Sequence, residues 1–557
     1  IRPTPQWLVS GAAARGGLLA RNLEAARDPA GFDRLRTGCA SNDRVSEVDA
    51  RAMRYRVAQI LACKGGVLAE ITIGDLLELF DAENVVRATR GGQVTFYGIL
   101  RELGLFGERA PLTLRALYTS GQRTPEELID RYVIGRGPIR DLLVEYLRER
   151  QPALDHTSLE ALAYYLGKRF WGDIERHHPE VTTLDLPRHV AQDWKLRLRT
   201  MTQRIRSANG EVSEQVVERI NYRECLTPVR SFYLDLAHWA VEDPARWSRW
   251  VAPCPVGAEE INRKKAIRQR KARMDARTRE RLPAVPALAQ RLTVRRTQAR
   301  ALLDVGRATP AGESFTSATG ATLVRSIVDD RAVAGRVWVH DPVTGTRRDL
   351  AKEEDRAFWA WAAVEVFRAT GLRVEELVEL SHHSLVQCKL PDTGELVPLL
   401  QIAPSKTDAE RLLVVSPELA EVLAEIIDRV RDPSGAVPLI LGYDSREKVW
   451  SALTPFLFQR PIAGENRRFP LSGIGDLITE ALDGCGLRDP DSGSLLRFTP
   501  HDFRRIFITD AILNGLPPHI AQVIVGHRDI NVTMGYKNPR ELHQTGVGGS
   551  ALRELAA

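Results

Sequence analysis

A run of positive charge in the middle of the chain sets the first limit on how the chain can fold. Residues 263–273 read RKKAIRQRKAR, a composition that favours a helix with cations on every side. A helix that packs against a hydrophobic core keeps an apolar stripe, and this segment has none. We therefore expect a solvated basic helix or linker over residues 256–300, with folded domains before and after it.

The positive charge of the chain is concentrated in this region. Residues 261–300 hold 14 lysines and arginines and two acidic residues, a net charge of +12, whereas the whole chain carries +6. The remainder of the chain is therefore acidic. Two interpretations stay open: the helix is a solvated linker, or it clamps the phosphate backbone of a nucleic acid. The second interpretation assigns DNA contacts to Arg263, Lys264, Lys265, Arg268, Arg270, Lys271 and Arg273.

The composition excludes several classes of protein. The 557 residues, 43% apolar and 27% charged, suffice for three or four domains and are typical of a soluble globular protein. No apolar run reaches the roughly 18 residues of a membrane span, so we expect a cytoplasmic protein with no membrane partner. The six cysteines include no pair at CxxC spacing, which argues against a zinc knuckle or a disulfide framework. We expect no metal and no cofactor.

Helical periodicity extends over nearly all of the chain before the basic segment, which predicts an all-helical N-terminal half. We divide this half into an N-terminal segment (1–45) and two helical modules (46–125 and 126–255). The second module contains a further basic stretch that suits a module lying along DNA. The residues of this stretch assigned to DNA contacts are Lys195, Arg197 and Arg199.

The sequence changes character after the basic segment. Residues 301–348 contain a Gly/Ser/Thr-rich run and strand-like stretches, which predict a linker with short strands. Residues 349–536 then combine helices with a β-meander, and a tail of residues 537–557 follows. The predicted fold class is a multidomain, mainly α protein with a small β-sheet, in which helical modules precede an α+β domain.

Two cations of the α+β domain stand where the chain can present them to a ligand. Arg373 begins a new helix directly after the helix stop Thr370-Gly371. Lys406 lies at the tip of a predicted hairpin. Either residue alone would be interpreted as an ordinary surface cation.

A second group of polar residues follows about a hundred positions later. His501 and Arg504 share one helix face at i, i+3 spacing. His527 lies just past the end of a short helix, and Tyr536 follows nine residues after it. A histidine in a loop past a helix end can face a ligand.

Together, Arg373, Lys406, His501, Arg504, His527 and Tyr536 resemble, in order and spacing, the catalytic signature of the tyrosine recombinases, the phage integrase family. The local sequences around Lys406 and His501 are most similar to those of large recombinases of integrated or transposon-like elements in high-GC bacteria. The resemblance implies an arm-binding or DNA-binding module over 46–125, a core-binding domain over 126–255 and a catalytic domain over 349–536. It also implies a bacterial, DNA-associated protein.

The chemistry of a DNA phosphodiester explains why these residue types occur together. Attack by an oxygen nucleophile builds negative charge on the nonbridging phosphate oxygens, and the forked guanidinium groups of Arg373 and Arg504 match that charge. Tyr536 is the implied nucleophile, and its phenol, with a reference pKa of about 10, is only about one-thousandth ionised at neutral pH. The tyrosine therefore needs a base or a strong local field.

The resemblance assigns the remaining roles. His501 is the candidate general base toward the tyrosine, and His527 donates a hydrogen bond to the phosphate. Lys406 supplies the proton that the leaving 5′ oxygen acquires. Glu376, three residues after Arg373 on the same helix, orients that arginine. The covalent 3′-phosphotyrosine stores the bond energy, so neither ATP nor a metal ion is needed.

The function implied is that of a site-specific DNA recombinase for integration, excision or transposition of a mobile element. Such an enzyme acts on double-stranded DNA through a Holliday junction, as a homo-oligomer, typically a tetramer. Accessory DNA-bending or element-encoded proteins are further candidate partners. Two alternatives stay open: relaxation of DNA in the manner of a type IB topoisomerase, and a catalytically silent DNA-binding regulator.

The basic segment gives a first prediction. Neutralising Arg268, Arg270, Lys271 and Arg273 together should weaken DNA binding, because contacts with backbone phosphates are lost. Each lost contact should also flatten the slope of log affinity against log salt concentration by about 0.9. Fluorescence anisotropy over a salt series measures this slope. An unchanged slope would return the helix to the solvated-linker interpretation.

Overall fold

The computed structural model describes most of the chain in detail. The described residues are 3–11, 16–42, 45–87, 92–135, 137–206, 212–262, 264–318, 320–327, 335–389, 391, 394, 396–404, 410–462, 465–489, 493–527, 529–530 and 533. Among the predicted site residues, Lys406, Tyr536 and Arg263 lie outside these ranges, as does the tail 537–557. The chain divides into two compact units, which are described separately: Ile1–Thr119 with Arg273–Gly442 and Ala452–Ala557, and Ser120–Ala272 with Tyr443–Ser451.

The N-terminal part of the first unit is helical and has one hydrophobic core. Phe32 and Leu35, from the predicted segment 1–45, are buried in the same cluster as Val57 and Phe80. The predicted N-terminal segment 1–45 thus shares a hydrophobic core with helices of the predicted module 46–125, because the early helices need the later ones to bury their apolar faces. The helices are α1 (Pro5–Gly11), α2 (Gly16–Ala26), α3 (Pro29–Ala40), α4 (Glu47–Lys64), α5 (Ile73–Arg87), α6 (Gln93–Glu102) and α7 (Leu114–Tyr118).

The second unit is a helical domain packed around large aromatic side chains. Phe170, Trp194 and Phe232 are fully buried in its core. Its elements are α8 (Pro125–Asp130), α9 (Pro138–Arg150), α10 (His156–Ala163), a π-helical segment (Tyr164–Trp171), α11 (Gly172–His177), α12 (Arg188–Arg199), β1 (Thr200–Arg206), β2 (Val212–Glu218), α13 (Tyr222–Glu242), α14 (Pro244–Trp247), β10 (Tyr443–Asp444) and β11 (Val449–Trp450).

The hairpin β1–β2 corrects the expectation of an all-helical N-terminal half. The two strands pair antiparallel, from Thr200 opposite Glu218 to Arg206 opposite Val212. The described side chains of both strands are exposed except for half-buried Val217. Because neither face is buried, the sequence lacks the alternation of apolar and polar residues that normally reveals a strand.

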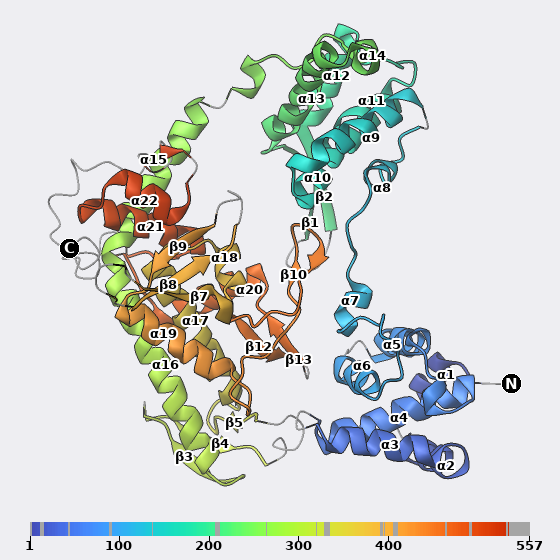
Figure 1. Ribbon diagram of the computed structural model, residues 1–557, viewed down its shortest axis with the longest axis vertical. Helices are drawn as coiled ribbons and strands as arrows, with labels where there is room; N and C mark the ends of the chain where they lie inside the picture. The colour runs from blue at the N-terminus through green and yellow to red at the C-terminus, as the bar shows by residue number, and fades with distance from the viewer. Residues whose placement is uncertain are drawn as a thin grey trace. The chain divides into compact units, whose positions relative to one another are not determined.

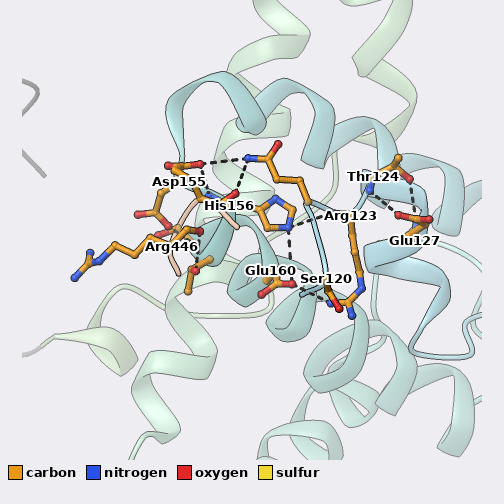
Figure 2. A network of polar contacts seen from close by, with 12 residues as sticks. Ser120, Arg123, Thr124, Glu127, Asp155, His156, Glu160 and Arg446 are labelled. Carbon is orange, nitrogen blue, oxygen red and sulfur yellow. Dashed lines mark hydrogen bonds and ion pairs between the residues drawn. The ribbon is translucent and has the colours of Figure 1, made fainter. Parts of the chain in front are cut away.

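A second hairpin, β10–β11, comes from the C-terminal half of the sequence but belongs to the second unit. Residues of this hairpin accept hydrogen bonds from the first N–H groups of α10, in the region around Asp155 and His156 that Figure 2 shows. The backbone N–H of Thr157 donates to the carbonyl of Arg446 at 2.9 Å, and that of His156 to the Glu447 carboxylate at 3.3 Å. The Asp155 side chain accepts from the N–H of Ser158 at 2.7 Å. These acceptors satisfy donors that a helix start leaves unpaired.

The remainder of the first unit is an α+β domain whose central helix is α17. This helix runs from Leu350 to Thr370, is buried along most of its length and ends on Gly371. The other helices are α15 (Lys264–Arg281, which begins in the second unit), α16 (Val285–Ala308), α18 (Val374–Glu379), α19 (Pro417–Val430), α20 (Leu471–Cys485), α21 (Pro500–Leu513) and α22 (Pro518–Val525).

The strands of this domain form small antiparallel sheets. The meander β7–β8–β9, labelled in Figure 1, is the predicted one, and its Leu400, Ile402 and Leu413 share a hydrophobic core with residues of α17. A four-stranded sheet in the order β3–β4–β5–β6 occupies the predicted linker 301–348 and has a small core of its own that includes Leu323 and Val339. The strands are β3 (Ser314–Thr316), β4 (Thr322–Arg325), β5 (Trp338–His340), β6 (Arg347–Asp349), β7 (Leu385–Lys389), β8 (Leu396–Ile402), β9 (Arg411–Val414), β12 (Gln459–Ile462) and β13 (Glu465–Arg468).

The predicted fold class, mainly α with small sheets and an α+β domain after helical modules, is confirmed. The predicted basic linker 256–300 differs in one respect. Its second part is the start of α16, where Val285, Leu288 and Leu292 pack into the core of the α+β domain. In the described part of the chain, no helix combines the length and apolarity needed to cross a membrane.

The start of α10 gives a second prediction. Asp155→Ala should lower the local stability of α10 by about 1 kcal/mol, because an N-cap acceptor is lost. Glu447→Ala should destabilise the same helix, although residue 447 lies in the C-terminal half of the sequence. Hydrogen exchange of the α10 amides measures both effects, with the exposed Glu421→Ala as the control. Exchange in α10 that is unchanged in Glu447→Ala would contradict the capping role of the hairpin.

Candidate active site

The site begins at the tight connection between α17 and α18. Gly371 has a φ of 61°, and a Cβ at this position would lie 2.5 Å from the ring of Phe507, so both conformation and space favour glycine. The connection places Arg373 at the N-cap of α18. The backbone N–H of Arg373 donates to Glu376 Oε2 at 2.8 Å, and its guanidinium donates to Glu376 Oε1 at 2.6 Å.

Glu376 is the centre of the site. Its side chain is fully buried and also binds Arg411, the first residue of β9, through two hydrogen bonds of 3.0 and 2.6 Å. Burial alone would raise the pKa of Glu376, but the hydrogen bonds and charges of Arg411 and Arg373 lower it to about 2. The carboxylate therefore stays ionised and fixes two guanidinium groups in place.

Arg504 reaches the same site from α21. The residue is only 2% exposed, and its guanidinium donates to the carbonyl of Gly371 at 2.9 Å and to that of Val525. It lies 4.0 Å from the Glu376 carboxylate. The carbonyl of Gly371, before α18, and that of Val525, at the end of α22, thus fix the orientation of the Arg504 guanidinium group.

The two histidines of the signature lie in the field of these arginines. His501, exposed in the first turn of α21, has a lowered pKa because of partial burial of the ring and the charges of Arg505 and Arg504. The pKa of His527 is lowered from 6.5 to about 4 by burial and by Arg504, Arg373 and Arg411. Both rings are therefore neutral at pH 7, which leaves His501 able to accept a proton.

The ring of His527 is oriented by its neighbours. Gly526 ends α22 with a φ of 67°, and the N–H and carbonyl of His527 both bond to Gln522. Its Nδ1 lies 2.9 Å from the hydroxyl of buried Thr533. When the threonine hydroxyl donates to Nδ1, the neutral ring presents its Nε2–H as a donor.

The described site is suited to an anion. The charges of Arg373, Arg411 and Arg504 exceed that of Glu376 by two, and forked guanidinium groups match the oxygens of a phosphate. Arg373, His501, Arg504 and His527, predicted from the sequence, are brought together. In the described ranges no cluster of His, Cys, Asp and Glu could hold a metal ion. Lys406 and Tyr536 belong to segments outside those ranges.

Arg411 was not among the predicted site residues. It and Leu413 are the buried residues of β9, whereas Leu412 and Val414 are exposed. A charge on the buried face of a strand requires a partner, and this alternation is the signal that could have identified it.

The predicted DNA-binding cations fall into two groups. The predicted DNA-binding cations of α15 that the structure describes are all exposed; they are Lys264, Lys265, Arg268, Arg270, Lys271 and Arg273. In the second unit, Lys195 is instead paired with Glu260 at 2.7 Å, and Arg197 donates twice to Asp173. Arg199 lies 5.7 Å from the centre of the Tyr222 ring. These six cations of α15 are thus more accessible to a nucleic acid than Lys195 and Arg197.

Comparison with known proteins identifies the α+β domain. Residues 348–543 match the model of the phage integrase family. Tyrosine recombinase XerD from Lacticaseibacillus casei is 25% identical over 186 residues, which are 33% of this chain and 52% of that protein. The chain thus spans about half the length of this curated relative. The protein carries a phage integrase family domain, as the predicted signature implied.

Solved structures of recombinases are also similar to parts of the chain. XerA recombinase shares 23% identity over 36% of this chain and 59% of its own, with a TM-score of 0.23. The Tn1549 transposon integrase, solved in complex with a circular intermediate DNA, shares 14% identity over 78% of this chain and 99% of its own, with a TM-score of 0.33.

The electrostatics of His527 give a third prediction. His527 should titrate near pH 4, and Arg411→Gln should raise its pKa because a nearby positive charge is removed. Between pH 6.5 and 4 the unfolded chain binds a proton at this residue that the folded chain does not bind. This group therefore lowers the free energy of unfolding as the pH falls through that range. NMR titration of the imidazole measures the pKa, and titration of His527 near 6.5 would contradict the described site.

Proposed function

We propose that the protein is a site-specific DNA recombinase that cleaves and rejoins strands through a covalent 3′-phosphotyrosine. The observation that carries this proposal is the convergence of Arg373, Arg504 and His527 on one cationic site around Glu376, within a phage integrase family domain. A site with fixed guanidinium groups and a neutral ring donor is suited to a phosphodiester whose negative charge grows during attack.

In this mechanism each described residue has one task. Arg373 and Arg504 bind the nonbridging oxygens of the scissile phosphate, and His527 donates a hydrogen bond from Nε2 to the same group. His501, neutral at pH 7 because of its lowered pKa, accepts the phenol proton of Tyr536 as the tyrosine oxygen attacks phosphorus. Lys406 protonates the leaving 5′ oxygen. The bond energy is kept in the phosphotyrosine until another 5′ hydroxyl attacks it.

The helical parts of the chain supply the DNA contacts in this proposal. The second unit acts as the core-binding domain, the helices before residue 120 act as an arm-binding or DNA-binding module, and the exposed cations of α15 follow the phosphate backbone. Four protomers act on two DNA duplexes and pass through a Holliday junction. The product is an integrated, excised or transposed element.

A covalent-trapping assay tests the proposal. Incubated without ATP and with EDTA, the protein should form an adduct on nicked suicide duplexes made from the DNA that flanks its own gene. The adduct should vanish in Tyr536→Phe and persist in Tyr118→Phe, which changes an exposed tyrosine outside the proposed site. Denaturing gel electrophoresis detects the adduct.

The same assay separates the proposal from its alternatives. Bound DNA with no adduct would contradict the catalytic proposal and favour a DNA-binding regulator. An adduct with relaxation of supercoiled DNA, but with no junction formed between two duplexes, would favour a topoisomerase instead of a recombinase.

A further inference from the structure

The second half of α15 holds the first turn of the helix that carries His501 and Arg504. Figure 1 shows α15 beside α21. Arg277 of α15 makes a two-pronged ion pair with Asp502, at 2.8 Å from Nε to Oδ1 and 2.6 Å from the second nitrogen to Oδ2. Asp502 is only 8% exposed. An ion pair in this setting is held more rigidly than one between exposed side chains.

A second set of contacts lies one turn further along α21. Arg505, 8% exposed, donates to Asp275 at 2.7 Å and to the hydroxyl of Thr278 at 3.2 Å. On the other side of the helix start, Arg281 donates to the carbonyl of Arg497 at 2.8 Å. Side chains of α15 thus contact both α21 and Arg497, which precedes α21 in the chain.

Asp502 links these contacts to the helix start itself. Its carboxylate accepts hydrogen bonds from the backbone N–H and the hydroxyl of Thr499, both at 2.8 Å, and so closes the N-terminal cap of α21. Burial would raise the pKa of Asp502, but Arg277 and Thr499 lower it. The carboxylate is therefore charged at neutral pH and binds α15 and the cap at the same time.

Along the first turns of α21, the residues that contact α15 alternate with the residues of the anion site. Asp502 and Arg505 face α15, whereas His501 and Arg504, the positions directly before them, belong to the anion site. A helix moves as a rigid rod over such a short length. A rotation or shift that moves one pair therefore moves the other, and a misplacement of about 1 Å at a reacting centre costs about a hundredfold in rate.

We propose that Arg277 and Asp275 are positioning residues that set the placement of His501 and Arg504 through Asp502 and Arg505. This inference rests on the proposed function and assigns two tasks to α15. Its exposed first half, with Lys264, Lys265 and Arg268, binds the DNA backbone, and its second half holds the catalytic helix. A change in the first half should alter DNA affinity, whereas a change in the second half should alter the rate of cleavage of bound DNA.

Single-turnover cleavage of a suicide duplex at saturating protein tests this division. Arg277→Gln should lower the rate constant at saturation at least tenfold and change the dissociation constant for DNA less than twofold, and Arg277→Lys should recover part of the rate. Arg431→Gln, which removes a surface pair with Asp428, is the matched control. A rate constant in Arg277→Gln within twofold of the unchanged protein would overturn the inference.

An exchange of the two charges of the Asp275–Arg505 pair shows whether a loss of cleavage comes from misfolding or from the broken ion pair. Asp275→Arg and Arg505→Asp should each slow cleavage, because each leaves two like charges facing each other. The double variant restores an opposite-charge pair and should cleave at least fivefold faster than the slower single variant. A double variant no faster than the slower single one would contradict positioning by this pair.

A readout that needs no catalysis separates this inference from the proposed function. The side-chain NMR resonances of His501 should shift in Arg277→Gln and Asp275→Asn and stay unchanged in Arg431→Gln. If the His501 resonances shift in these variants but the unchanged protein forms no DNA adduct, the placement by α15 is supported and the recombinase proposal is overturned. Unshifted resonances in both variants would overturn the placement, even if the protein cleaves DNA.

Discussion

The buried carboxylate of Glu376 is the interaction on which the candidate site depends. A carboxylate in the protein interior is costly unless cations bind it, and here Arg373 and Arg411 do so from α18 and β9. The same charge keeps Arg504 within 4.0 Å despite the repulsion among the guanidinium groups. Without Glu376, three like charges would face one another. The carboxylate therefore turns a set of repelling side chains into a fixed anion site.

The second constraint is the position of α21, because this helix supplies both His501 and Arg504. On one side Arg504 is bound to backbone carbonyls next to α18 and α22, and on the other side Asp502 and Arg505 are bound to α15. A helix held on two faces has little freedom to rotate. The basic helix that divides the chain is therefore also part of the support of the candidate site.

The sequence predicted the parts of this arrangement that depend on local pattern. Arg373 after a helix stop, His501 and Arg504 at i, i+3 spacing and His527 past a helix end were found because, as a set, their order and spacing resemble the signature of the phage integrase family. Arg411 and Arg277 were not, since their carboxylate partners lie 35 and 225 residues away and only the fold brings them together. The hairpin β1–β2 was missed because it buries neither face. The hydrophobic core that residues 1–45 share with the next helices was also not predicted, because apolar residues do not reveal which helices pack together.

A structure of the protein bound to a suicide duplex that carries the proposed recombination site would show where the scissile phosphate binds. We expect the nonbridging oxygens of that phosphate within hydrogen-bonding distance of the guanidinium groups of Arg373 and Arg504 and of His527 Nε2, with Glu376 still bound to Arg411. A scissile phosphate held elsewhere on the protein, with this cluster empty, would contradict this expectation.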